Sequence, residues 1–79
     1  MHGYSIRVAE AVRNADESLL GVQLGRKCIE RNIPIVDVAR ILNVSRQTVY
    51  SWFTGLTHPH PHRREAILVW MRLDLKISD

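Results

Sequence analysis

With 79 residues the chain has room for a single domain, and a hydrophobic content of 46% excludes an intrinsically disordered protein. The formal charge of +3 permits a nucleic-acid partner, and the single cysteine excludes an internal disulfide and fits a reducing compartment. The sequence has no run of about 18 apolar residues, so it predicts no membrane-spanning helix.

The N-terminal segment predicts a loose end followed by a short helix. We expect residues 1–4 to be loosely held, as chain termini often are. Within residues 5–14 some apolar residues alternate as in a strand, but Val8, Val12 and Ala15 also recur at helical spacing. The alanine and glutamate residues at the centre of this segment favour the helix.

A second helix is predicted to follow a short polar break. Its apolar face carries Val22, Cys28 and Ile29. Gly21 and Gly25 lie in the middle of that face, where each glycine costs helix stability, so we expect another helix to cross closely there. Cys28 is expected to fill the core rather than act as a nucleophile, because no histidine or acid stands beside it in the sequence.

Residues 35–55 predict two short helices joined by a tight turn. Four apolar residues share one face of the first helix, namely Ile35, Val38, Ala39 and Leu42. Asn43 follows, and asparagine is one of the few non-glycine residues that adopts the left-handed conformation at low cost, as a sharp turn requires. Ser45 is expected to cap the start of the second helix, and Gly55 to end it.

The second helix of this pair has two unlike sides. Thr48, Val49 and Trp52 cluster on one side, with Phe53 at its edge. The other side carries hydrogen-bonding side chains, one of them cationic, and no carboxylate; its residues are Arg46, Gln47, Tyr50, Ser51 and Thr54. Such a surface suits a helix that lies in an anionic groove lined with base edges.

A loop is predicted over residues 56–62, where histidine alternates with proline. The alternation invites a metal site at His58, His60 and His62. However, the prolines favour an extended backbone that throws alternate side chains apart, and the loop has no Cys, Asp or Glu to complete a tetrahedral set. We therefore expect no metal ion there, and consider phosphate contact by His58 or His62, or a plain solvated loop.

The last helix is predicted over about residues 63–76. Its apolar residues nearly encircle the axis, and they are Ala66, Ile67, Leu68, Val69, Trp70, Met71, Leu73 and Leu75. A helix that is apolar all round needs cover on more than one side, which a chain of this size can hardly supply alone. We therefore expect a homodimer through this helix, with Leu68, Met71 and Leu75 at the interface.

The two-helix stretch resembles the helix-turn-helix of the phage-repressor and Cro-type DNA-binding family. The residues that carry the resemblance are Ala39, Leu42, Val44, Val49 and Trp52, together with the run from Ser45 to Val49. A wider resemblance runs from about Leu19 to Pro59, roughly half of the chain. The turn has Asn43 where the family usually has glycine, and the first motif helix starts with Pro34-Ile35 where Ser or Thr followed by Gln is common.

This resemblance implies an all-α fold, namely a compact lambda repressor-like domain of four to five helices that spans residues 1–79, with the helix-turn-helix at its centre. It implies sequence-specific binding of double-stranded DNA by a Cro-like transcriptional repressor, in the cytoplasm of a bacterial cell or a phage-infected host. Base readout is expected from Arg46, Gln47, Tyr50, Ser51 and Thr54. Phosphate contacts are expected from Ser45, Thr48, His58, Arg63 and Arg64. No cofactor and no small-molecule ligand are expected.

Two other interpretations remain open at this stage. Within DNA-binding proteins, the chain could be an antitoxin or a recombination-accessory protein instead of a repressor. In a different class, it could be a protein-interaction module that uses the apolar C-terminal helix and keeps the motif only as a scaffold. We do not expect an enzyme, because the sequence has no paired-carboxylate motif, no glycine-rich phosphate loop and no Cys/His ligand spacing.

Overall fold

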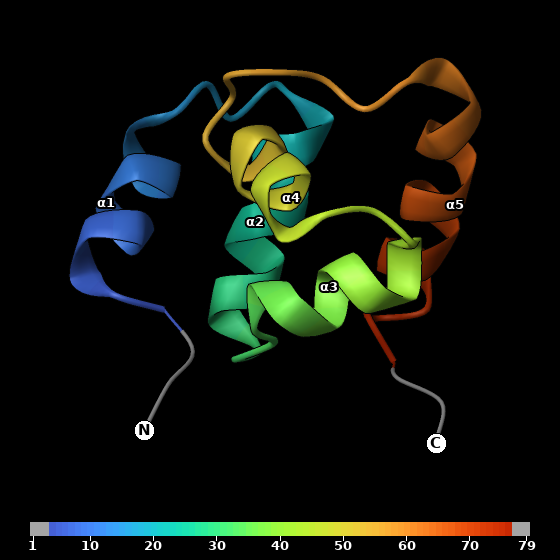
Figure 1. Ribbon diagram of the computed structural model, residues 1–79, viewed down its shortest axis with the longest axis horizontal. Coiled ribbons are helices and arrows are strands. Elements are labelled where there is room, and N and C mark those ends of the chain that lie inside the picture. The colour runs from blue at the N-terminus through green and yellow to red at the C-terminus, as the bar shows by residue number, and fades with distance from the viewer. Residues whose placement is uncertain (1–3, 77–79) are drawn as a thin grey trace.

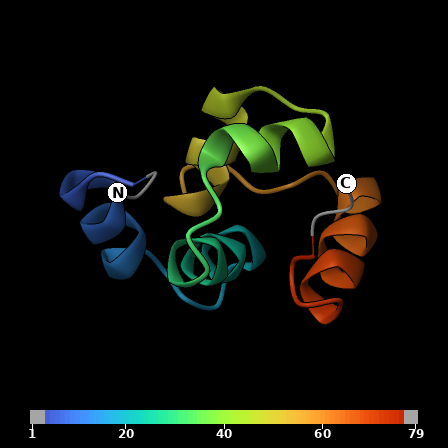
Figure 2. The ribbon, with the colours of Figure 1, turned by 90° about the horizontal axis from the view of Figure 1, so that it is seen from below.

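A computed structural model describes residues 4–76, and within this range the chain is all-helical with no strand. In chain order the helices are α1 (Ile6–Asn14), α2 (Leu20–Glu30), α3 (Ile35–Leu42), α4 (Arg46–Phe53) and α5 (Pro61–Arg72). Helix α2 lies behind α4 in Figure 1, with α1 and α5 on opposite flanks, and the view from below in Figure 2 shows α3 and α4 together on one side of α2. The predicted all-α fold with a central helix-turn-helix is confirmed.

The crossing of α2 and α4 is as close as the two glycines predict. A Cβ atom added to Gly21 would lie 2.6 Å from the Trp52 carbonyl oxygen, and one added to Gly25 would lie 2.7 Å from Cγ of Phe53. Real Cβ atoms do not approach other atoms so closely, so only glycine allows the two helices to pack at this separation. This contact fixes where α4 sits on the rest of the molecule.

The core is formed by residues from all five helices. The side chains that are fully buried and largest are Phe53, Leu24, Ile67, Val12, Val22, Val38, Val49 and Cys28. Phe53 was expected at the edge of the inward side of α4, but it is fully buried, and its ring stacks near that of Tyr4 with ring centroids 6.5 Å apart. Cys28 fills the core, as its sequence context predicts.

The N-terminal helix is confirmed, but one expectation about the segment before it is wrong. Helix α1 begins after Ser5, whose hydroxyl oxygen accepts a hydrogen bond from the Val8 backbone N–H at 3.2 Å. The sequence places Tyr4 in a loose end, yet its hydroxyl donates to the Ile33 carbonyl oxygen at 2.6 Å and so ties this part of the chain to the segment before α3. The rest of that predicted loose end, residues 1–3, lies outside the described residues.

The last helix begins and ends earlier than the sequence predicts. His60 is its N-cap and Pro61 its first residue, a position that suits proline because the missing N–H has no helical partner there. After Arg72 the chain reverses through Asp74 and Leu75, whose φ angles are 66° and 57°. The Leu75 N–H donates to the Trp70 carbonyl oxygen at 2.9 Å, and the Leu75 side chain, 3% exposed, turns into the core.

None of the helices within residues 4–76 is long and apolar enough to span a membrane.

Candidate nucleic-acid interface

The turn between α3 and α4 has the conformation that its sequence predicts. Asn43 adopts the left-handed conformation with φ 57° and ψ 50°. Its N–H donates to the Arg40 carbonyl oxygen at 3.3 Å, and the Val44 N–H donates to the Ala39 carbonyl oxygen at 3.0 Å. These bonds satisfy carbonyl groups that the end of α3 would otherwise leave unpaired. A single left-handed residue thus turns the chain from one motif helix into the next.

The start of α4 is held by a pair of hydroxyl side chains. The Ser45 hydroxyl oxygen accepts from the Thr48 backbone N–H at 3.0 Å, which confirms Ser45 as the N-cap. The two hydroxyl oxygens of Ser45 and Thr48 lie 2.8 Å apart and share one further hydrogen bond. Because each hydroxyl has one hydrogen, one of the two remains to be donated outward. Ser45 and Thr48, two of the five residues predicted to contact phosphate, therefore lie together at the start of α4 with one free donor.

The two sides of α4 are divided as the sequence predicts. Val49, Trp52 and Phe53 are buried against the rest of the domain. At about 100° per residue, Gln47 lies nearly opposite the mean direction of these three residues, with Ser51 beside it. The five residues predicted to read bases share this outer side: Arg46 and Gln47 are exposed, whereas Tyr50, Ser51 and Thr54 are half-buried. Figure 1 views α4 almost along its axis, in front of α2.

Thr54 is the least free of these side chains. Its hydroxyl donates to the Tyr50 carbonyl oxygen at 2.9 Å, which is a contact within its own helix end. The hydrogen of the hydroxyl is therefore engaged, and only acceptor capacity remains for an external ligand. Gly55 follows with φ 80°, which confirms the predicted helix end.

The residues predicted to contact phosphate outside α4 are separated into two places. His58 and the exposed Arg64 line one groove of about 350 Å³, together with residues at the start of α2 and Leu68. Arg63 does not join them. Its guanidinium donates to the Leu42 carbonyl oxygen at 2.9 Å and so bridges α5 to the end of α3. Sequence periodicity gives no sign of this contact, because the two residues are 21 positions apart.

The histidine loop departs from its sequence prediction. The alternate side chains of His60 and His62 were expected to point apart, but their ring centroids are 4.3 Å apart and their Nδ1 atoms 2.6 Å apart. The reason is that α5 already begins at Pro61, so the chain is helical where an extended backbone was expected. His60 Nδ1 also accepts from the His62 N–H at 3.3 Å. No group of three metal-binding side chains occurs in the described part of the chain.

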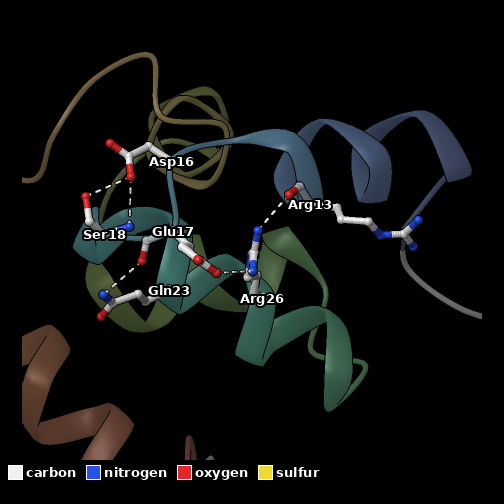
Figure 3. Close-up of polar contacts among 6 residues, drawn as sticks. All are labelled: Arg13, Asp16, Glu17, Ser18, Gln23 and Arg26. Atoms are coloured by element: carbon white, nitrogen blue, oxygen red, sulfur yellow. Dashed lines mark hydrogen bonds and ion pairs between the residues drawn. The ribbon is translucent and has the colours of Figure 1, made fainter.

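On the α1 flank, polar contacts hold the connection between α1 and α2 in place (Figure 3). The Arg26 guanidinium donates to Glu17 Oε1 at 3.0 Å and to the Arg13 carbonyl oxygen at 2.6 Å. The Asp16 carboxylate accepts from the Ser18 N–H and hydroxyl, and these hydrogen bonds hold the pKa of the carboxyl below its usual value. Arg26 is thus committed to protein groups.

Comparison with known proteins supports the motif but not the particular family that it resembles. The family described as the helix-turn-helix domain of resolvase matches residues 26–55, which cover the end of α2, all of α3 and α4, and the turn. No curated protein and no solved structure matches the chain. A kinship with phage repressors in particular is therefore not shown. Residues 26–55 are thus similar to a helix-turn-helix domain, and α3, the turn and α4 form that motif.

Proposed function

We propose that the protein binds double-stranded DNA with sequence preference and reads the major groove with the outer side of α4, residues 45–54. The observation that carries the proposal is the division of α4 within a helix-turn-helix: its inner side is buried, and its outer side has donors and acceptors and no carboxylate. A helix with such a side fits the major groove, where base edges offer hydrogen bonds and the flanking phosphates repel carboxylates. This role requires no cofactor and assigns no catalytic step to the chain.

Two residues are proposed as the principal readers of base edges. Gln47 is exposed nearly opposite the buried side of α4 and, as a planar amide, can pair bidentately with adenine N6 and N7. Arg46, in the exposed first turn, can pair with guanine O6 and N7. Side chains near the N-terminus of a recognition helix are those that reach base edges in this class of motif. Ser45, Thr48, His58 and Arg64 are then assigned to phosphate positioning.

Two biological roles are proposed as alternatives. A compact DNA-binding domain with no second sensing unit in the described residues suits a Cro-like transcriptional repressor, which acts by occupying its site. The match of residues 26–55 to the helix-turn-helix of resolvase favours a second candidate, a DNA-binding protein of site-specific recombination. The two roles place the same helix in the same groove, and they differ in what the bound protein recruits or blocks.

The experiment that tests DNA binding begins with selection of bound duplexes from a random pool. The affinity for the selected site is then measured over a range of salt concentrations. We expect log K to fall with log salt at a slope of about −0.9 for each phosphate neutralised. A salt-independent affinity, or no selected sequence at low salt, would refute the proposal and favour the protein-interaction alternative.

Substitution of Gln47 or Arg46 tests which side of α4 faces the bases. We expect Gln47→Ala and Arg46→Ala each to cost roughly 1–3 kcal/mol on the selected site and to relax preference at one or two base pairs. Arg7→Ala, which removes an exposed charge from α1, is the control for a loss of charge alone. If both α4 variants keep the wild-type sequence preference in a competition assay, the side of α4 that carries Arg46 and Gln47 does not face the bases.

A further inference from the structure

The contact between Arg63 and the end of α3 assigns this arginine a task other than the phosphate contact expected from sequence. We propose that Arg63 is a positioning residue, which fixes the turn of the helix-turn-helix and thereby the start of α4. The inference rests on the proposed DNA-binding function. It deepens that function by naming a residue that supports sequence preference without touching DNA.

The first argument is the place of the hydrogen bond. The Ala39 and Arg40 carbonyl groups accept from N–H groups of the turn, whereas the Leu42 carbonyl takes its hydrogen bond from the Arg63 guanidinium at 2.9 Å. Leu42 is the last residue of α3 and stands three positions before Ser45, the N-cap of α4. Arg63 therefore hydrogen-bonds to the backbone at the point where the chain turns from α3 into α4.

The second argument is electrostatic. Arg63 lies in the first turn of α5, a turn without acidic residues, where the helix dipole disfavours a cation. The C-terminal end of α3 favours one, because its last carbonyl groups carry partial negative charge. By reaching from the start of α5 to the end of α3, the guanidinium moves its charge from an unfavourable helix end to a favourable one. The half-buried setting strengthens this charge-assisted bond relative to one in open water.

The third argument is that the other end of α5 is held as well. The Arg31 guanidinium, directly after α2, is hydrogen-bonded and ion-paired to the Asp74 carboxylate, just past α5. Arg31 is the C-cap of α2, so one arginine ties the segment after α5 to the end of α2 and the other ties the start of α5 to the end of α3. With the far end held, loss of the Arg63 contact frees the turn rather than the whole helix.

This role makes a prediction that differs in kind from that of a phosphate contact. A lost phosphate contact makes the salt dependence of binding shallower by about 0.9 and weakens all sequences alike. A lost positioning contact leaves the salt dependence unchanged and reduces the preference for the selected site, because the readers on α4 are no longer held in register. Arg64, which is exposed next to Arg63, supplies the phosphate-contact comparison.

The experiment measures two quantities for wild type and for Arg63→Ala, Arg63→Lys and Arg64→Ala: the salt slope, and the ratio of affinities for the selected site and a scrambled site. For Arg63→Ala we expect a slope equal to that of wild type and a ratio lowered about tenfold, the size expected from one charged hydrogen bond. Arg63→Lys should restore most of the ratio, because an ammonium can still donate to the Leu42 carbonyl. Arg64→Ala should show the reverse pattern, a shallower slope with the ratio kept.

Three outcomes would overturn the inference. A shallower slope with an unchanged ratio in Arg63→Ala would make Arg63 a phosphate contact. An Arg63→Ala variant with the wild-type salt slope and the wild-type affinity ratio would show that the hydrogen bond to Leu42 does not contribute to sequence preference. A lowered ratio that Arg63→Lys does not restore, with both variants folded by circular dichroism, would show that another property of the guanidinium matters. Wild type is measured first, so failure of the DNA-binding function itself is recognised before any variant is compared.

Discussion

The thiol of Cys28 is fully buried among core residues of α2 and its neighbours. Burial disfavours the thiolate and raises the pKa of Cys28 to about 12. Because the thiolate is the reactive form, we expect the native protein to resist iodoacetamide at pH 8 and to react fully after unfolding in guanidinium. Rapid labelling of the folded protein, followed by mass spectrometry, would show that Cys28 is more accessible than its place in the core allows.

The carboxylate of Asp74 makes stability depend on pH at the acid end. The Arg31 guanidinium, hydrogen-bonded to it, holds the pKa of Asp74 below its ordinary value of 3.8. A carboxyl whose pKa is lower in the folded state contributes stability that is present above pH 3.8 and is lost as the pH falls through the folded value. We expect the urea midpoint of wild type to decline in this range, and Asp74→Asn to show a smaller decline.

The control for the acid prediction is Glu10→Gln, which removes an exposed carboxylate from α1, where no ion pair is present among the described residues. It should keep the wild-type decline with pH. Equal acid profiles for wild type and Asp74→Asn would mean that the contact between the C-terminal end of α5 and Arg31 contributes nothing in solution, as is common for exposed ion pairs.

At the scale of elements, the crossing of α2 and α4 gives the sharpest prediction about stability. Alanine is about 1 kcal/mol better than glycine inside a helix, so Gly21→Ala would stabilise an isolated α2. In the folded protein the new Cβ would meet the Trp52 carbonyl oxygen at 2.6 Å, and a backbone atom cannot move aside as a side-chain end can. We expect a net loss of roughly 1–3 kcal/mol, measured by urea unfolding.

The matched substitution for this test is Glu30→Ala, at an exposed position of the same helix. It should change the free energy of unfolding by no more than about 0.5 kcal/mol. If Gly21→Ala were as stable as wild type, α2 and α4 could not cross as closely as described. Because Trp52 belongs to the helix proposed to read DNA, a destabilised Gly21→Ala should also bind its selected site more weakly.

The elements show which features a sequence can predict and which it cannot. The turn at Asn43, the cap at Ser45 and the end at Gly55 follow from residues adjacent in the chain, and all were predicted and confirmed. The contacts of Tyr4 with Ile33 and of Arg63 with Leu42 join residues 29 and 21 positions apart, and no periodicity encodes them.

The ends of α5 were misplaced for two local reasons. Proline between histidines predicts extended backbone, but at the first position of a helix proline is favoured, and Pro61 occupies that position in α5. The reversal after Arg72 passes through Leu75, a residue that seldom adopts the left-handed conformation. The bond from the Trp70 indole N–H to the Lys76 carbonyl oxygen at 3.0 Å, and the burial of the Leu75 side chain, hold that reversal. Packing therefore overrode the local preference.

At the scale of the whole molecule, the reversal after α5 changes which residues are available to a partner. Leu75 was expected at a dimer interface, but it is buried in its own core, and Met71 is half-buried and packs against that core. The exposed large apolar residues of this flank are Leu68, Val69 and Leu73, at 41%, 40% and 58% exposure. At about 100° per residue Leu68, Val69 and Leu73, the last directly after α5, fall on one side of the helix, which they share with the exposed Glu65 and Arg72. We propose that side as the surface for a second copy of the chain.

The dimer proposal also follows from how little DNA one copy can read. Helix α4 has eight residues, and a single recognition helix of that length contacts only a few base pairs. A two-fold pair places two such helices about one helical turn apart on a palindromic site, which adds their base contacts without any new reading residue. In both ribbon views α5 lies on one flank of the domain and α1 on the opposite flank, so pairing through α5 leaves α1 away from the partner (Figures 1 and 2).

Sedimentation at micromolar concentration tests this arrangement with two charged substitutions at exposed apolar positions. We expect wild type to sediment as a dimer and Leu68→Glu as a monomer, because a carboxylate in an apolar contact loses its hydration without gaining a partner. Ile6→Glu, at a position 79% exposed on the α1 flank, should remain a dimer. In footprinting, the dimer should protect a two-fold-symmetric site and Leu68→Glu should need far higher concentrations. A wild-type monomer that protects a single half-site would refute the dimer and would require one copy of α4 to supply all the sequence preference.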